Sequence, residues 1–444
     1  MKRILLALFL LPLFSVAQNS LNTTLLYNWQ DSTLVSSYMW DNVYNEIWGV
    51  VVNDREFAII GSTDGTHIFD VTDPVNSIMV AYVAGEYQGD GVIHRDYHDY
   101  QGYLYIVCDE GWDVSTLQIV DISDLPNSVS VVYASNDLLN TVHNIFIDTT
   151  SARLYTTSGK VLSIEDPENP TLLYSTGDLY LHDLYVRNDT VYANTGGSLK
   201  VYDFSMMSET NQTHEEIGAL LSYPNQGYNH SGWLSADGDY YVMADETHGM
   251  KMKMVDVSDL TNMTVVSLFN SEVDPMSVPH NQIIHGDYVY TAHYHDGLYV
   301  HDISDASNPS LVAFYDTFSP EHHDSYMGAW GVYPFLPSGN ILVSDMQTGL
   351  YVLGVDYSSP PVSVAGLGEN TVSVYPNPTT KQLNIRLAEG EKAMASIYNM
   401  QGQKVMETKV LGRKTISLAF LPAGVYNLSL DVNEVKMNRK IIKQ

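Results

Sequence analysis

Four histidines recur at nearly even spacing in the middle of the chain, each at the start of a short apolar stretch. They are His143, His182, His230 and His280, separated by 39, 48 and 50 residues. Imidazole is a side-chain donor that suits zinc, copper, iron and nickel. If the fold brings these positions together, they form a candidate site for a transition-metal ion.

Acidic residues and a further histidine lie in loops that we expect to open beside these four positions. Carboxylate oxygens coordinate calcium as well as transition metals, so the cofactor indicated is a transition metal or calcium. The loop residues that join the candidate metal ligands are Glu110, Asp245, Glu246 and His293.

A second interpretation of the same histidines is structural. A polar residue that enters a buried strand often hydrogen-bonds a neighbouring backbone, because buried polar groups need partners. An Asn or Asp follows three of the histidines, as Asn144, Asp183 and Asn281, and fits a role in fixing a turn. In a metal site the same neighbours would fix the tautomer of the ring. The sequence leaves both interpretations open.

The histidines belong to a repeat of four short strands, whose third strand has the clearest marker. An apolar run ends in an acidic residue and a turn, and we expect the acid to accept hydrogen bonds from that turn. The last copy lacks the acid. The copies are Gly65–Pro74, Leu117–Leu125, Val161–Pro170, Leu199–Phe204, Met252–Leu260, Leu298–Pro309 and Gly349–Val355.

The first strand of each copy has its own marker, an aromatic, basic or imidazole residue at its entry. The seven entry residues are Trp48, Arg95, His143, His182, His230, His280 and Trp330. Seven copies at a period of about 40–50 residues predict an all-β fold, a seven-bladed β-propeller over residues 18–355. The innermost strands of a propeller line its channel, so we expect the entry residues to form a ring at the channel mouth.

The two ends of the repeat region indicate how the propeller closes and where it stops. The seventh copy lacks an outer strand, and residues 23–30 (TTLLYNWQ) are similar to the outer strand PTLLYSTG of an earlier copy. We therefore expect residues 23–30 to complete the last blade. Pro, Ser and Gly in residues 356–370 indicate a linker. Short alternating strands in residues 371–444 predict a small C-terminal β-sandwich.

Charge is distributed unevenly along the 444 residues, whose net charge is −31. Residues 18–370 hold 8 Lys and Arg against 47 Asp and Glu, whereas residues 371–444 hold 11 against 5. The acidic surface argues against nucleic acid as a partner, because phosphate binding requires positive charge. No segment after residue 17 reaches the roughly eighteen apolar residues of a transmembrane helix. The single cysteine, Cys108, rules out an internal disulfide.

The first seventeen residues have the pattern of a secretory signal peptide. Lys2 and Arg3 precede the apolar run Ile4–Phe14, and small residues at positions 15 and 17 favour cleavage before Gln18. We expect Sec-dependent export into the periplasm.

The C-terminal segment resembles the sorting domain of the type IX secretion system of Bacteroidetes. The residues that carry this resemblance are Tyr375, Pro376, Asn377, Pro378, Gly402, Pro422, Gly424 and Tyr426. The resemblance covers residues 371–444 and implies that the type IX machinery is a partner of this tail. It also implies removal of the tail and a final location outside the cell or on the outer-membrane surface.

Residues 40–355 are similar to LVIVD-repeat proteins of the choice-of-anchor B type. The matching segments include LQIVDIS (Leu117–Ser123), HNIFID (His143–Asp148) and PHNQII (Pro279–Ile284). This resemblance implies a propeller fold and a surface location, and it implies no established biochemical activity.

Two functions follow from these observations. The leading hypothesis is an exported propeller that acts as a binding or scaffold module for an extracellular ligand or protein. The alternative is a metal-dependent enzyme with a His-lined site at the channel mouth. Metal content separates the two, because the enzyme requires about one transition-metal ion per chain.

Overall fold

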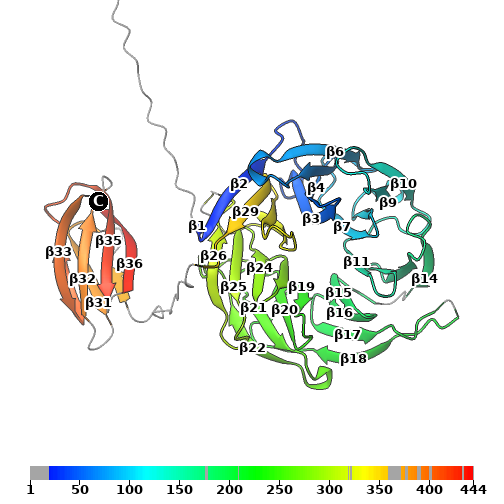
Figure 1. Cartoon of the computed structure of the whole chain (residues 1–444). Helices are drawn as coiled ribbons and strands as arrows, with labels where there is room; N and C mark the ends of the chain where they lie inside the picture. The colour runs from blue at the N-terminus through cyan, green and yellow to red at the C-terminus, as the bar shows by residue number, and fades with distance from the viewer. Residues whose placement is uncertain are drawn as a thin grey trace, which may run out of the picture. The chain divides into compact units, whose positions relative to one another are not determined.

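Seven antiparallel sheets stand in a ring around a central axis in the computed structural model of the chain (Figure 1). The predicted all-β, seven-bladed propeller is therefore confirmed. The structure describes residues 20–175, 179–208, 210–318, 320, 323–358, 372–375, 379–387, 392–399, 403–432 and 435–443.

The first three blades each use one sequence repeat, and their strands follow chain order from the axis to the rim. Blade 1 consists of β3 (Tyr44–Val52), β4 (Arg55–Ser62), β5 (Gly65–Asp70) and β6 (Ile78–Ala84). Blade 2 consists of β7 (Arg95–Tyr100), β8 (Tyr103–Cys108), β9 (Leu117–Asp121) and β10 (Ser130–Ser135). Blade 3 consists of β11 (Ile145–Asp148), β12 (Arg153–Thr156), β13 (Lys160–Ser163) and β14 (Thr171–Ser175).

The next three blades repeat this arrangement. Blade 4 consists of β15 (Asp183–Arg187), β16 (Thr190–Asn194), β17 (Leu199–Asp203) and β18 (Glu215–Leu220). Blade 5 consists of β19 (Asn229–Leu234), β20 (Tyr240–Asp245), β21 (Met252–Asp256) and β22 (Thr264–Phe269). Blade 6 consists of β23 (Gln282–His285), β24 (Tyr288–Ala292), β25 (Leu298–Asp302) and β26 (Ser310–Tyr315). Short 3₁₀ turns lie at Pro74–Asn76, Trp112–Val114 and Leu260–Asn262.

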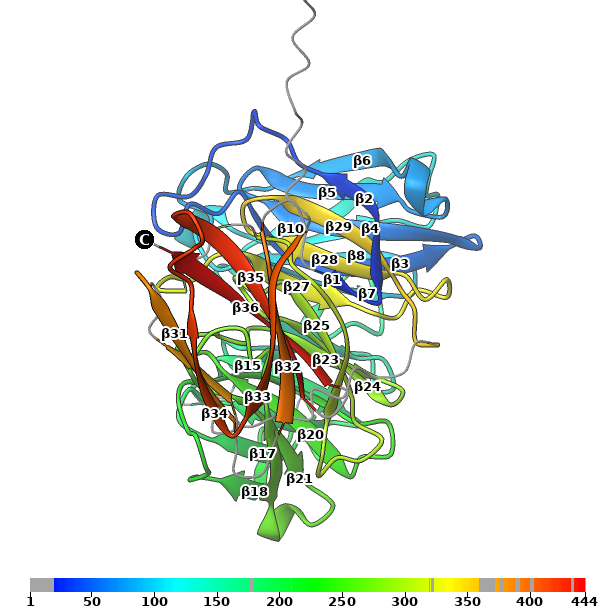
Figure 2. The same ribbon diagram turned by 90° about the vertical axis from the view of Figure 1, so that its left-hand side faces the viewer.

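The seventh blade combines both ends of the propeller chain. Its inner strands are β27 (Ala329–Tyr333), β28 (Ile341–Asp345) and β29 (Gly349–Val355), and its outer strand is β2 (Thr23–Trp29). Strand β2 pairs antiparallel with β29, which is the place that the sequence assigned to residues 23–30. Figures 1 and 2 both show these two strands side by side. A two-residue strand, β1 (Ser20–Leu21), pairs with the outer edge of blade 6.

Each sheet is packed on both faces, which explains the continuous apolar runs of the middle strands. In β8, Leu104 and Ile106 join the core on the side of blade 1, whereas Tyr105 and Val107 join the core on the side of blade 3. Successive side chains of a strand point to opposite faces, so every residue of such a run is buried. A single repeat would leave both faces exposed, and the ring of blades is therefore the folding unit.

The acid that ends the third strand fixes the turn after it, as the sequence predicted. Asp121 Oδ1 accepts hydrogen bonds from the backbone N–H and the hydroxyl of Ser123, at 2.9 and 2.6 Å. Asp256 and Asp302 accept the same pair of bonds from the serine two residues later. These acids stabilise turns between strands and take no part in the site described below.

The C-terminal part of the chain forms a second compact unit, Ser363–Gln444, and the rest of the chain, Met1–Val362, forms the first. One sheet contains β30 (Val372–Tyr375), β31 (Gln382–Leu387) and β34 (Arg413–Ser417). The other contains β32 (Lys392–Tyr398), β33 (Lys404–Leu411), β35 (Gly424–Val432) and β36 (Val435–Lys443). Both sheets contribute apolar side chains to one core, as expected for the predicted β-sandwich.

Several predicted segments lie outside the described residues. They are the signal peptide at residues 1–17, most of the linker at 356–370, and Pro376, Asn377, Pro378 and Gly402 of the sorting motif. Of the remaining motif residues, Tyr375 ends β30, Gly424 begins β35, and the hydroxyl of Tyr426 donates to the carbonyl of Pro422 at 2.9 Å. Within the described part of the chain, no helix has the length and apolar character needed to span a bilayer.

Candidate functional site

The four predicted histidines lie together at one end of the propeller axis, each contributed by a different blade. His182 directly precedes the inner strand of its blade, and His143 and His280 lie two residues before theirs. His230 lies within β19. Successive ring centroids are 4.7 Å (His143 to His182), 4.4 Å (His182 to His230) and 4.5 Å (His230 to His280) apart. Trp330 continues the series at 4.4 Å from His280.

A fifth histidine, His94, closes this loop of rings. Its ring centroid lies 4.6 Å from His143 and 5.3 Å from Trp330. The sequence assigned the blade 2 position to Arg95, the first residue of β7. Arg95 instead turns away from the axis and donates hydrogen bonds to the carbonyls of Ser62 and Tyr87, at 2.9 and 2.7 Å. We call the circle of five side chains, His94, His143, His182, His230 and His280, the imidazole ring, and a single five-membered ring is named by its residue.

Trp48, the predicted entry residue of blade 1, lies at a different level of the axis. Its indole N–H donates to Asp99 at 2.8 Å, and its ring lies 4.6 Å from that of His98. The pairing of β3 with β4 shifts register between Tyr44 and Ile47, which displaces Trp48 along the strand. Register shifts also occur at Asn229/Ser231 and Ala329/Gly331, and these bulges place His230 and Trp330 in the loop of rings.

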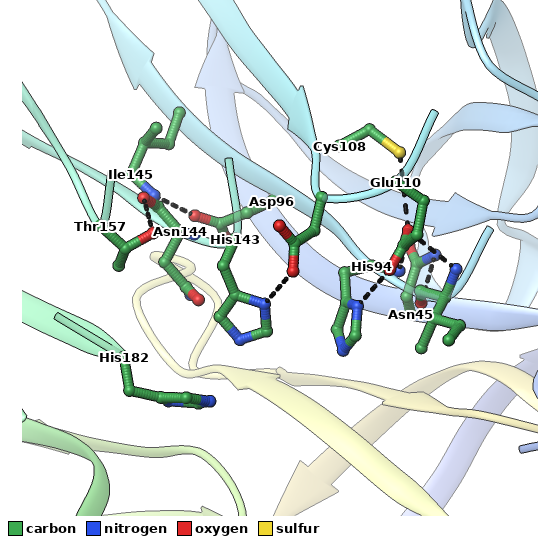
Figure 3. Close-up of polar contacts among 12 residues, drawn as sticks. Asn45, His94, Asp96, Cys108, Glu110, His143, Asn144, Ile145, Thr157 and His182 are labelled. Atoms are coloured by element: carbon green, nitrogen blue, oxygen red, sulfur yellow. Dashed lines mark hydrogen bonds and ion pairs between the residues drawn. The ribbon is translucent and has the colours of Figure 1, made fainter. Parts of the chain in front are cut away.

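Hydrogen bonds at Nδ1 orient four of the five imidazoles. His94 Nδ1 contacts Glu110 Oε1 at 2.6 Å and His143 Nδ1 contacts Asp109 Oδ2 at 3.0 Å. Figure 3 shows the other nitrogen of each of these rings turned toward the same region, into which the ring of His182 also points.

The other two Nδ1 atoms of this set face backbone carbonyls. His182 Nδ1 donates to the carbonyl of His230 at 3.2 Å, and His280 Nδ1 donates to the carbonyl of Trp330 at 2.6 Å. An imidazole that donates from Nδ1 presents a lone pair at Nε2, the arrangement found in histidine metal ligands. His230 differs, because its buried Nδ1 has no hydrogen-bond partner among the described residues.

Burial lowers the pKa of four imidazoles, those of His143, His182, His230 and His280, and keeps them neutral at pH 7. Loss of solvation, with smaller contributions from neighbouring histidines, lowers the pKa of His182 and of His280 to about 3. The same causes hold the pKa of His230 well below its ordinary value, and burial lowers the pKa of His143. Neutral imidazole is the form that coordinates metal ions, so these four side chains are in the form that can act as donors.

The carboxylates of Asp109 and Glu246 lie close enough to the histidines to form groups of possible metal ligands with them. Glu246 Oε2 lies 3.7 Å from His230 Nε2, and the hydroxyl of Tyr294 donates to its other oxygen. Burial raises the pKa of Glu246 to about 7. Donor atoms lie within 4.8 Å of one another in three groups of side chains. These groups are His143/His182/His230, His94/Asp109/His143 and His230/Glu246/His280.

Two residues that the sequence placed among the metal ligands lie apart from the imidazole ring. Asp245 is fully buried, where it pairs with Lys253 at 2.9 Å and accepts a hydrogen bond from Tyr223. His293 is also fully buried, between Asn270 and Asp296. Asp245 ends the second strand of blade 5 and His293 directly follows the second strand of blade 6, but each side chain bonds the partners just named and not the imidazole ring. Glu110, also predicted as a metal ligand, instead orients His94 through the hydrogen bond to its Nδ1.

Three members of the imidazole ring, His94, His143 and His182, line an open cavity of about 800 Å³. Aromatic side chains line its walls, among them Trp40, Tyr180, Tyr228 and Tyr326. Trp40 packs edge-on against Tyr326 with centroids 5.6 Å apart, and the hydroxyls of Tyr180 and Tyr228 are 2.8 Å apart. The lining contains Asp109 and Glu246 and no Lys or Arg, which favours neutral or cationic ligands over anions.

Three acids occupy the channel beyond the ring. Glu46, Asp96 and Asp183 line a chamber of about 70 Å³ together with Asn144 and Asn281. Burial raises the pKa of Glu46 and of Asp183 to about 8 and that of Asp96 to about 7. Figure 3 shows Asp96 bound to the backbone of Ile145 beside Asn144.

Aromatic rings also line this chamber, among them those of Trp48, Phe146 and Trp233. The centroid of Phe146 lies 5.8 Å from that of Trp233. The channel therefore has three successive levels, imidazole, carboxylic and aromatic. His94 and this acid level were missed in the sequence, although His94 directly precedes the marker Arg95 and Asp183 directly follows His182.

Comparison with known families matches two parts of the chain. Residues 230–271 and 282–317 match the LVIVD repeat, and residues 373–444 match the secretion system C-terminal sorting domain. The matched repeats contain the whole of blade 6 and most of blade 5. None of the curated proteins compared with the chain matches its sequence. The sorting domain indicates export to the cell surface or the extracellular space.

Comparison with solved structures shows the same fold in distant proteins. The β-propeller domain of Myceliophteria thermophila Cps50 (Swd1) is 12% identical with a TM-score of 0.50, covering 75% of this chain and 100% of that one. The WD40 β-propeller domain of Doa1 is 10% identical with a TM-score of 0.50, covering 76% and 98%.

A third similar structure is PorZ, a surface component of the type IX secretion system of Porphyromonas gingivalis. It is 12% identical with a TM-score of 0.46, and the alignment covers 94% of this chain and 61% of PorZ. The propeller domains of Cps50 and Doa1, at identities this low, establish the fold alone.

Proposed function

We propose that this chain, which carries LVIVD repeats and a C-terminal sorting domain for secretion, is an exported binding protein that holds a transition-metal ion on its imidazole ring. The observation that carries the proposal is the convergence of five imidazoles from five successive blades. Four of them engage Nδ1, which leaves Nε2 as the donor atom.

The cavity above the ring suits the binding role. It is wide enough for a small molecule or a protruding side chain, and its aromatic walls offer flat apolar surfaces beside hydroxyl groups. Such walls favour a neutral carbohydrate or a protein loop, with the metal ion as one point of attachment. The structural interpretation of the histidines predicts no metal and a cavity that binds through its walls alone.

The metal is tested by elemental analysis of untagged full-length protein, before and after dialysis against Zn²⁺. We expect at least one transition-metal ion per chain in the wild type. The variant His143→Gln/His182→Gln/His230→Gln should retain none above background, while His285→Gln, which alters an exposed histidine outside the ring, should match the wild type. A wild type that retains no zinc after dialysis overturns the proposal.

Azide tests whether the metal is open to ligands. The protein loaded with Co²⁺ should change its visible absorption on addition of azide, because a metal held by three protein side chains keeps a position for an external ligand. An unchanged spectrum would show a closed, structural ion and would contradict the binding role.

A metal-dependent hydrolytic enzyme is the second candidate, and the position of Glu246 favours it. Its carboxylate lies 3.7 Å from His230 Nε2 and Tyr294 holds it in place, so it could accept a proton from a metal-bound water. Zinc-loaded protein should then hydrolyse p-nitrophenyl acetate, and Glu246→Gln should lower the rate at least tenfold while an ion held by His143, His182 and His230 is retained. The binding role predicts no turnover above free zinc.

The route of export is proposed from the sequence. Residues 1–17 act as a signal peptide for Sec-dependent transport, and the sorting domain then hands the folded propeller to the type IX machinery. Sequencing the N-terminus of the secreted protein tests this route, and a start at Gln18 is the expected result.

A further inference from the structure

The imidazole ring is too wide for a single metal ion to use all of it. Five histidines and Trp330 form a closed loop whose neighbouring centroids are 4.4 to 5.3 Å apart. Zinc takes four ligands in most protein sites, with zinc–imidazole bonds of about 2.0–2.1 Å, so five imidazoles are more than one ion uses. An ion must therefore bind a subset of the ring.

The donor atoms divide into two sets that share no residue. One set is His94, His143 and Asp109, and the other is His230, His280 and Glu246. Each offers two imidazoles and one carboxylate, a donor combination that binds divalent first-row metals. His182 lies between them and belongs to the third group, with His143 and His230, where a single ion would bind instead.

Charge in the channel matches two dications better than one. Asp109, Glu110 and Glu246 already surround the imidazole ring. The chamber beneath adds Glu46, Asp96 and Asp183, and no Lys or Arg of the described chain forms an ion pair with these three acids. A second dication would balance the carboxylates nearest the imidazole ring, and it would also favour ionisation of the three acids below, whose pKa values burial raises to about 7 and 8.

We propose that the imidazole ring holds two first-row transition-metal ions, one on His94, His143 and Asp109 and the other on His230, His280 and Glu246. The inference rests on the proposed metal-binding function and extends it from one ion to a pair. His182 separates the two sets and is dispensable for metal content in this arrangement. A dinuclear centre can bridge one ligand between both ions.

Metal stoichiometry tests the pair in the full-length protein. After treatment with a chelator and dialysis against Zn²⁺, the wild type should retain two zinc ions per chain. His94→Gln should retain one, and His182→Gln should retain two. His285→Gln is the matched control for loss of an imidazole and should also retain two. Unchanged thermal unfolding of the metal-free variants verifies that each still folds.

Copper spectroscopy tests whether the ions are neighbours. Protein loaded with two Cu²⁺ should give a spin-coupled electron paramagnetic resonance spectrum with a half-field signal, and His94→Gln should give an isolated copper signal. One zinc per chain that persists in His94→Gln and is lost in His182→Gln overturns the pair but leaves the proposed function standing. Two uncoupled ions also overturn the pair, whereas no retained zinc overturns both proposals.

Discussion

At the scale of single residues, Lys253 and Asp245 form an ion pair inside blade 5. Both side chains are fully buried and the charged atoms are 2.9 Å apart. Asp245 also accepts a hydrogen bond from Tyr223, so its carboxylate is held from two sides. Loss of one partner from such a pair leaves an uncompensated charge in the core.

Lys253→Met should therefore lower the free energy of unfolding by about 3–5 kcal/mol, as measured by urea denaturation. Lys200→Met is the matched control, since Lys200 and Glu216 form a partly exposed pair at 2.9 Å. An exposed pair contributes about 0–1 kcal/mol. Equal losses in the two variants would contradict the assigned role of the buried pair.

His301 gives a prediction for pH. It is 3% exposed, and burial lowers its pKa to about 3 from an ordinary value of 6.5. Between pH 6.5 and 3 the unfolded chain binds a proton there that the folded chain does not. Its contribution to the free energy of unfolding therefore decreases as the pH is lowered through this range, by about 1.4 kcal/mol per pH unit. When the pH is lowered from 6 to 4, the free energy of unfolding of His301→Gln should decrease less steeply than that of the wild type, by about 1.4 kcal/mol per pH unit, because one fewer proton is bound on unfolding. Parallel curves for the two proteins would refute this.

At the scale of elements, the number and order of the blades could be predicted from the sequence because each repeat carries two separate markers, one in its first strand and one in its third. The identity of the axial residues could not be predicted fully, since one extra residue in a strand changes which side chain faces the channel. Trp48 was displaced in this way, and His94 was missed because Arg95 occupied the expected position. Asp245 and His293 were misplaced because residues at these positions can bond other buried side chains instead.

Strand β29 depends on a glycine where β2 joins it. Gly349 has φ +87°, and a Cβ there would lie 2.1 Å from the carbonyl oxygen of Trp29. Gly349→Ala should lower the melting temperature more than Gly339→Ala, because Gly339 also has positive φ (+76°) but faces open space. Thermal unfolding followed by circular dichroism provides the comparison. Similar losses would show that strain alone, without the contact to β2, explains the effect.

At the scale of the whole molecule, closure of the ring depends on a segment far from the blade it completes. Strand β2 pairs with β29 from Thr23↔Val355 to Trp29↔Leu350. Leu26, Tyr27 and Trp29 also pack against the core between blades 7 and 1. The propeller is therefore held as a ring by strand pairing between its two chain ends.

Deletion of residues 18–32 should lower the melting temperature by more than 10 °C, because it exposes the edge of β29 and part of that core. Deletion of the sorting domain, residues 363–444, serves as a control that leaves every blade intact. A melt of the propeller that is unchanged by the first deletion would contradict closure through β2.

The central claim is that imidazoles at the channel mouth bind a transition-metal ion, and X-ray absorption at the zinc edge tests it most directly. Zinc-loaded protein should show a nitrogen or oxygen shell at about 2.0–2.1 Å and the outer-shell scattering of at least two imidazoles. The imidazole scattering should disappear in His143→Gln/His182→Gln/His230→Gln. A wild-type spectrum with oxygen neighbours only, and no imidazole scattering, would contradict the account.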